Sequence, residues 1–269
     1  MLRKTIFGLI GASVSAAALT APAHGAGGGD LLVAPTRLVM DGRRGTEVVL
    51  NNIGSEPATY RVSLELRRMN AEGKLDTVET PSPAEAAALD MIAYAPRKVT
   101  LQPNQPQSIR VGVRPPDGLL DGEYRVHMLF RAIPEAQPAS AAQPATENLS
   151  IALTPIYGIT IPVIVRTGEL AAQAAISDAK VVTTGSQRSV SFELARTGTR
   201  SLYGDVKLAR PGAETIVLAR GIAVYPEIAR RNVTLPLEAG ATGGSAILQY
   251  VERPEDGGRV LAETPLALR

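Results

Sequence analysis

Residues 148–166, NLSIALTPIYGITIPVIVR, decide the fold class of this chain. In the first half of the stretch, apolar side chains alternate with small or polar ones, so that Leu149, Ile151 and Leu153 fall on one face of an extended strand. The second half, residues 159–165, is rich in β-branched residues, which favour strands. The pattern therefore predicts β-structure rather than helix.

The sequence just before this stretch has almost nothing to bury. Residues 134–147, PEAQPASAAQPATE, are mostly Pro, Ala, Gln and small polar residues, a composition typical of a long loop. A strand that follows such a loop often lies at a sheet edge, and an apolar edge strand invites pairing with another chain. We therefore expect an apolar edge strand at Leu149, Ile151 and Leu153.

Short strands separated by turns fill the rest of the first half. Pro35 indicates an edge position or a strand that switches between sheets. Residues 84–89, AEAAAL, favour a helix of at most a turn or two, because the segment is short and prolines flank it. The predicted strands cover residues 31–40, 46–51, 59–67, 91–99, 107–113 and 123–133.

The same pattern resumes after Gly168. Glycines punctuate the predicted strands, which cover residues 175–182, 189–195, 203–209, 215–225, 231–237, 246–251 and 260–268. About seven strands in about a hundred residues fits an immunoglobulin-like sandwich. The sequence therefore predicts an all-β chain of two immunoglobulin-like β-sandwich domains, residues 26–167 and 168–269.

Residues 1–25 predict a cleaved secretory signal peptide. Arg3 and Lys4 precede a short apolar run at residues 6–19, and a small-x-small cleavage pattern follows at residues 23–25. The run is too short for a comfortable membrane span, and an uncleaved anchor is the weaker alternative. No other stretch is apolar enough to cross a bilayer, so we expect an exported protein that is not embedded in the membrane.

Charge and cysteine content narrow the class of partner. Residues 1–25 hold two basic and no acidic residues, so their removal brings the formal net charge from +2 to zero. Nucleic-acid binding thereby loses its main support. The chain has no cysteine, and export without cysteine favours a bacterial periplasm.

The residues indicate no enzymatic reaction. We find no cluster with metal-ligand spacing, no phosphate-binding loop and no implied cofactor, and a lone histidine inside a strand, His127, is typical of a structural role. Two non-enzymatic alternatives stay open. One is an exported structural two-sandwich protein, such as a pilus subunit or adhesin, and the other is a carbohydrate-binding module. The absence of Trp argues against the second.

Three segments together resemble the periplasmic pilus-assembly chaperones, the immunoglobulin-like chaperones of chaperone–usher systems. They are PTRL at residues 35–38, EYRVHMLFRAIP at residues 123–134, and the alternating segment that starts at Leu149 and runs on to Arg166. The resemblance covers most of the first domain and indicates a divergent branch. It implies two sandwiches set at an angle, pilus or fimbrial subunits as partners, and delivery to an outer-membrane usher.

The resemblance also implies a mechanism. A pilus subunit is a sandwich that lacks one strand, and such a chaperone lends its alternating strand to fill the gap, a case of β-strand addition. The lent side chains would be Leu149, Ile151 and Leu153. Whether the free protein covers this strand in a self-capping dimer stays open.

Four further residues take their expected roles from the resemblance. Arg37 matches the arginine that lies between the domains and binds the terminal carboxylate of the subunit, a task that suits the planar guanidinium. The family adds a lysine at about Gly158, which this chain lacks, so Tyr157 and another basic group would share the site. Glu123 and Arg166 match an interdomain salt bridge, which an acid of the second domain should complete.

Overall fold

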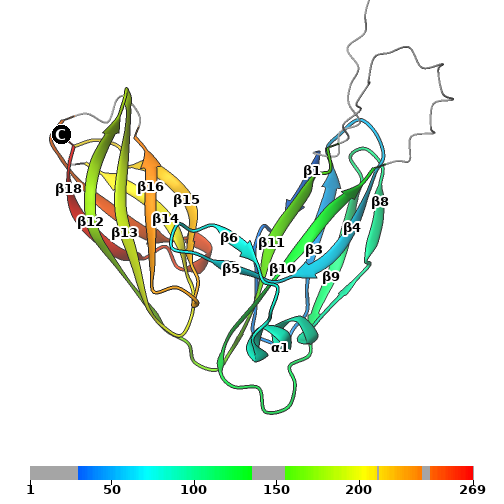
Figure 1. Cartoon of the computed structure of the whole chain (residues 1–269). Helices are drawn as coiled ribbons and strands as arrows, with labels where there is room; N and C mark the ends of the chain where they lie inside the picture. The colour runs from blue at the N-terminus through cyan, green and yellow to red at the C-terminus, as the bar shows by residue number, and fades with distance from the viewer. Residues whose placement is uncertain (1–29, 135–154, 211, 238–242, 269) are drawn as a thin grey trace, which may run out of the picture.

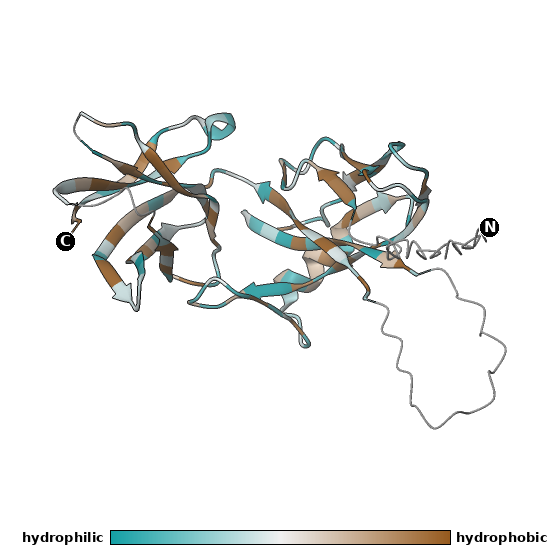
Figure 2. Cartoon of the chain, turned by 90° about the horizontal axis from the view of Figure 1, so that it is seen from above, coloured by the Kyte–Doolittle hydropathy of each residue, from teal (hydrophilic) through white to brown (hydrophobic). Residues whose placement is uncertain are grey.

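The computed structural model describes residues 30–134, 155–210, 212–237 and 243–268. The described chain forms two lobes, each a sandwich of two antiparallel or mixed β-sheets (Figure 1). Viewed from above, the two lobes lie side by side along an elongated molecule (Figure 2). The predicted fold class, all-β with two sandwiches at an angle, is confirmed.

The first sandwich packs a four-stranded sheet, in the order β1-β3-β9-β7, against a five-stranded sheet, in the order β2-β11-β10-β4-β8. A separate hairpin, β5–β6, belongs to neither sheet. The elements are β1 (Leu31–Ala34), β2 (Leu38–Met40), β3 (Thr46–Asn52), β4 (Ala58–Glu65), β5 (Arg67–Met69), β6 (Leu75–Thr77), α1 (Pro83–Met91), β7 (Ile92–Ala95), β8 (Lys98–Leu101), β9 (Pro106–Val113), β10 (Gly122–Ile133) and β11 (Gly158–Thr167).

The second sandwich packs a three-stranded sheet, in the order β12-β13-β16, against a four-stranded sheet, in the order β15-β14-β17-β18. Each of the seven predicted strands of this half is present. They are β12 (Ala172–Thr184), β13 (Gln187–Gly198), β14 (Leu202–Ala209), β15 (Ile216–Val224), β16 (Arg230–Pro236), β17 (Ser245–Glu252) and β18 (Val260–Ala267), with a short 3-10 turn, η1 (Pro254–Asp256), before β18.

Two prolines divide strands between the sheets of the first sandwich. Pro35 separates β1, which pairs with β3, from β2, which pairs with β11 in the opposite sheet. The predicted switch at Pro35 is confirmed. Pro96 separates β7 from β8 in the same way, so the prediction of one continuous strand over residues 91–99 was wrong. In both cases proline offers no N–H to continue the ladder, and the chain crosses to the other sheet.

Each domain has its own apolar core. In the first domain Tyr60 and Phe130 are among the largest fully buried side chains, and in the second Tyr250 is. The helix is longer than expected, because Ser82 and Glu85 form a capping box at its start and Pro83 suits the first helical position. No helix among the described residues is long and apolar enough to cross a membrane.

Candidate functional site

The strand β11 lies near one edge of its sheet. On one side it pairs with β10 along its whole length, from Gly158 to Thr167. On the other side β2 covers only the three residues from Val163 to Val165. Among the described residues, no strand therefore pairs with residues 158–162 on this outer side. Just before β11, Ile156 is 49 % exposed and Tyr157 is 52 % exposed, so apolar surface continues beyond the strand.

The residues predicted to be lent to a subunit, Leu149, Ile151 and Leu153, lie outside the described residues, as do residues 135–147 and the predicted signal peptide, residues 1–25. Their roles stay predictions. Figure 1 shows that the described chain resumes close to β11, at the end of the first lobe far from α1.

Arg37 lies at the interface between the domains, just before β2. Its guanidinium stacks on the ring of Tyr203 in the second domain, 4.3 Å from the ring centroid, and its Nη2 donates to Ser201 Oγ at 3.4 Å. Its Nε is buried without a hydrogen-bond partner among the described residues, and burial lowers the pKa of the guanidinium. The cation therefore keeps unused donors, which suits an incoming carboxylate.

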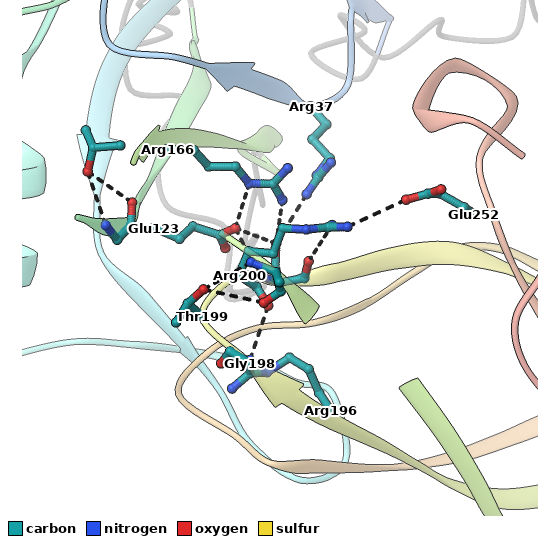
Figure 3. A network of polar contacts seen from close by, with 12 residues as sticks. Arg37, Glu123, Arg166, Arg196, Gly198, Thr199, Arg200 and Glu252 are labelled. Atoms are coloured by element: carbon teal, nitrogen blue, oxygen red, sulfur yellow. Dashed lines mark hydrogen bonds and ion pairs between the residues drawn. The ribbon is translucent and has the colours of Figure 1, made fainter. Parts of the chain in front are cut away.

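Glu123 and Arg166 face each other across β10 and β11, and both belong to the first domain. Arg166 Nε donates to Glu123 Oε2 at 2.9 Å (Figure 3). The second domain joins through Ser201, whose backbone N–H and hydroxyl both donate to Glu123 Oε2 at 3.0 Å. A serine thus stands where an acid of the second domain was expected.

Hydrogen bonds from Arg196 stabilise the turn that precedes Ser201. Arg196, only 8 % exposed, donates to the carbonyl oxygens of Gly198 at 2.8 Å and of Arg200 at 3.2 Å. Arg200 in turn lies 3.8 Å from the buried carboxylate of Glu252 (Figure 3). Both hydrogen bonds tie the turn to the buried Arg196 side chain, and so they help to fix the position of Ser201.

The structure does not bring Tyr157 to Arg37. Continuing the β2–β11 register by one residue places Pro162 beside Arg37, and Tyr157 is five residues earlier, roughly 16 Å away along the strand. Strand alternation also puts the two side chains on opposite faces of the sheet. The second basic group that the structure brings to this point is Arg166, which donates to Ser201 Oγ at 3.2 Å.

Gly158 is an exposed position at which an added side chain would meet Leu129. A Cβ built at this position would lie 3.0 Å from Leu129 Cδ1 and 3.6 Å from the carbonyl oxygen of Phe130. The tip of the Leu129 side chain would have to move slightly to accommodate a larger residue here.

Sequence reasoning missed the contribution of the second domain to this interface. Tyr203, Tyr225 and Glu227 contact arginines of the first domain, yet no local pattern marks them. Glu123, Arg125 and His127 alternate along β10 and therefore share its outer face. Three ionisable side chains on one face of a strand are the sequence feature that could have indicated a polar interface there.

The part of the chain that the structure describes offers no alternative site of clear chemistry. It contains no group of three or more His, Cys, Asp or Glu residues that could hold a metal ion. His127 is 1 % exposed, and burial, with Arg125 and Arg67 nearby, lowers its pKa to about 3. A shallow, open depression over β3, β7 and β9, lined in part by Glu47 and Arg110, gathers no convergent set of polar groups.

The chain is similar in structure to several solved proteins. The matching solved structures include pilus chaperones. The YadV chaperone is 14 % identical, with 89 % of this chain and 100 % of that chain covered at a TM-score of 0.47. The CupB2 chaperone of Pseudomonas aeruginosa is 13 % identical, with 88 % and 100 % covered at 0.45.

A third match is the chaperone–tip subunit pre-assembly complex, CsuC–CsuE, from the archaic chaperone–usher Csu pili of Acinetobacter baumannii, which is 12 % identical, with 88 % of this chain and 97 % of that chain covered at a TM-score of 0.45. No family model matches the chain, and no curated protein matches it in sequence. At these identities the likeness concerns the fold, and what each of these chaperones binds is a property of that protein.

Proposed function

We propose that this chain is a periplasmic chaperone that binds, folds and caps pilus subunits and delivers them to an outer-membrane usher. The subunit is an exported immunoglobulin-like domain that lacks one strand. The chaperone lends residues 149–153 to complete the subunit's sheet, so that main-chain hydrogen bonds satisfy the open edge while Leu149, Ile151 and Leu153 fill the exposed groove.

The main support for this proposal is the outer side of β11, part of which is unpaired among the described residues. The alternating segment ends at Leu153, and β11 begins at Gly158, so the predicted lent segment runs directly into a strand whose outer side has no partner over residues 158–162 in the described chain. An edge of this kind pairs readily with another strand.

Two edge strands of the second domain carry features that oppose such pairing. β12 has an irregularity at Asp178, where φ is +52°, and a lysine at position 180. β18 contains Pro265, which cannot donate to a ladder. On β11 the comparable residue is Pro162, which stands beside the end that β2 already covers. The contrast favours the open side of β11 over these two edges.

Apolar burial supplies enough free energy for capture. Each fully buried aliphatic side chain contributes about 1.5–3 kcal/mol, so the three lent residues together contribute on the order of 5–9 kcal/mol. Arg37 adds orientation, because a guanidinium grips a carboxylate with two hydrogen bonds and would hold the terminal carboxylate of the subunit. Its buried, unpartnered Nε supports this role.

The test is co-expression in the periplasm with a pilus-type subunit, defined as a small exported immunoglobulin-like domain that lacks its final strand. Tagged wild-type chain should retain the subunit through purification, and Ile151→Asp should lose it. Ser150→Asp, which alters the opposite face of the same segment, is the matched control and should retain it. Retention by Ile151→Asp equal to that of the wild type would reject the lent-strand assignment.

A further inference from the structure

The β5–β6 hairpin leaves the first domain and lies against the second. Among the described residues its strands pair only with each other, and Figure 1 shows the hairpin between the two lobes. The backbone N–H of Asn232 in β16 donates to the carbonyl oxygen of Ala71 at the hairpin turn, at 2.7 Å. The N–H of Met69 donates to Glu227 Oε1 at 2.8 Å. Two hydrogen bonds thus fix the hairpin to the other domain.

The hairpin turn also packs closely on the second domain. Gly73 has a φ of +77°, and a Cβ at this position would collide with the guanidinium of Arg231. Arg231 is itself held by a hydrogen bond from its Nη1 to the carbonyl oxygen of Ala223 at 2.6 Å. The positive φ favours glycine here, and a Cβ would force the Arg231 guanidinium out of its present position.

A third apolar cluster, separate from the two domain cores, forms under the hairpin. It contains Met69 and Ile164 from the first domain and Ala223 and Tyr225 from the second, all 7 % exposed or less. Ile164 lies on the outer face of β11, where strand alternation would otherwise expose it. The second domain is therefore part of what buries this face.

Arg125 and Glu227 join the hairpin to this cluster. The guanidinium of Arg125 lies 3.6 Å from the ring centroid of Tyr225 and donates to both carboxylate oxygens of Glu227, at 2.5 and 3.2 Å. It also donates to the carbonyl oxygen of Arg67, at 2.9 Å. One carboxylate of the second domain therefore binds both β10, through Arg125, and the hairpin, through Met69.

The same edge of the second domain holds Arg37. Tyr203, on which Arg37 stacks, is the direct neighbour of Ala223 in the β14–β15 register. Tyr225 lies two residues further on, and burial raises its pKa while Arg125 and Arg37 both act in the opposite direction, as expected for two cations close to one hydroxyl. Two cation–π contacts thus join the domains, one between Arg37 and Tyr203 and one between Arg125 and Tyr225.

We infer that the β5–β6 hairpin and Glu227 form an interdomain clasp that positions Arg37 for its carboxylate ligand. Glu227 and the hairpin are positioning elements, because they act on Arg37 through Arg125, Tyr225 and Tyr203 rather than by touching the ligand. The inference rests on the proposed function, since the carboxylate ligand belongs to it.

Physical reasons favour such a device in this chain. Domains joined by a short linker move relative to each other unless a substantial interface prevents it. The linker between β11 and β12 spans residues 168–171, and Ser201 supplies one polar attachment point. The clasp supplies a second attachment with an apolar centre. Two separated attachments restrain a rotation that one would permit, and they thereby keep the Arg37 guanidinium stacked on Tyr203.

The test uses the full chain with two variants that open the clasp from opposite sides, Glu227→Ala and Gly73→Ala. Glu193→Ala is the matched control, because it removes an acid of the same domain whose partner is an exposed arginine, Arg230. Circular dichroism confirms that each variant keeps its fold. Spin labels on Glu56→Cys and Thr184→Cys, both at exposed positions, report the distance between the domains, and no native cysteine interferes.

We expect one narrow distance distribution for the wild type and for Glu193→Ala, and a clearly broader one for both clasp variants. The second readout is the Nε–H resonance of Arg37 during titration with acetate, a minimal carboxylate, with acetamide as the neutral control. Acetate should bind at least threefold more weakly in the clasp variants, with acetamide without effect throughout. A merely structural role would leave the acetate affinity unchanged.

The outcomes separate this inference from the proposed function. Unbroadened distances in both clasp variants would overturn the clasp. Broadened distances with unaltered acetate affinity would overturn the positioning role of Glu227 and leave the carboxylate site of the proposed function standing. Failure of acetate to shift the Arg37 resonance in the wild type would contradict the carboxylate site itself, and the positioning role with it.

Discussion

Replacement of Ser201 by alanine should weaken the attachment between the two domains. The Ser201 side chain is fully buried, and its hydroxyl donates to Glu123 Oε2 at 3.0 Å while it accepts from Arg166 at 3.2 Å and from Arg37 at 3.4 Å. Alanine keeps the backbone N–H that also binds Glu123, so the variant removes one side-chain group from an otherwise intact network.

The expected cost follows from the charge and burial of the partners. The Glu123 side chain is 1 % exposed, so water does not replace the lost donor freely. A hydrogen bond to a buried charged group contributes about 1.5–3 kcal/mol. Because two other donors to Glu123 Oε2 remain, we expect the free energy of unfolding to fall by about 2 kcal/mol. Ser191→Ala is the control, since its hydroxyl accepts one exposed bond at 3.4 Å, and its effect should stay within about 0.5 kcal/mol.

Urea unfolding followed by tyrosine fluorescence and by circular dichroism measures the effect. If the interface couples the two domains, Ser201→Ala should also split a single transition into two or lower its apparent m-value. A loss equal to that of Ser191→Ala, with one unchanged transition, would refute the claim that Ser201 carries a structural attachment between the domains.

Three further predictions concern single ionisable groups. Arg37→Ala should lower subunit affinity at least tenfold in calorimetry without melting the fold, while Arg44→Ala, at an exposed position, should not; equal affinities would remove the carboxylate role. Hydrogen bonds and charge from Arg68 lower the pKa of Glu85 to about 2, so the stabilisation it gives is full above pH 4.5 and is lost as the pH falls toward 2. Chemical unfolding should therefore show Glu85→Gln less stable than the wild type at pH 7 and equal to it near pH 2; a gap that persists would count against the pair. Burial lowers the pKa of His127 to about 3, so the folded protein keeps this imidazole neutral while the unfolded chain binds a proton below about pH 6.5. The free energy of unfolding therefore falls as the pH is lowered from 6.5 toward 3. Between pH 6.5 and 4.5 the wild type should lose up to about 2.5 kcal/mol relative to His127→Gln, and parallel pH profiles would show that His127 is not buried as a neutral group.

Strand patterns in the sequence predicted most of the fold, because alternation and turn residues are local. The alternation in β4 and β10 and the seven strands of the second domain could be placed in this way. Local patterns could not show that the strand predicted at residues 91–99 divides at Pro96, since which sheet a strand joins depends on packing across the sandwich. The hairpin β5–β6 was also missed, because its short strands face the other domain instead of their own core.

The candidate site was predictable only where a motif marks it. Arg37, Glu123 and Arg166 stand in recognisable segments, and the structure brings all three to one interface with Ser201. Tyr157 was placed by counting along the sequence, and counting cannot supply the register between β2 and β11 that puts Pro162 beside Arg37. The contacts from the second domain are separated from their partners by up to about a hundred and sixty residues, and no single sequence pattern reports such pairs.

Hydrogen exchange of the chain in the free form and in complex with a pilus-type subunit tests the central claim most directly. If a subunit pairs with the lent segment and the outer side of β11, those amides of residues 149–161 that are not already bonded to β10 should exchange at least tenfold more slowly in the complex, while amides of the β12 edge should not change. A tightly bound subunit that leaves these amides exchanging as they do in the free chain would contradict the account.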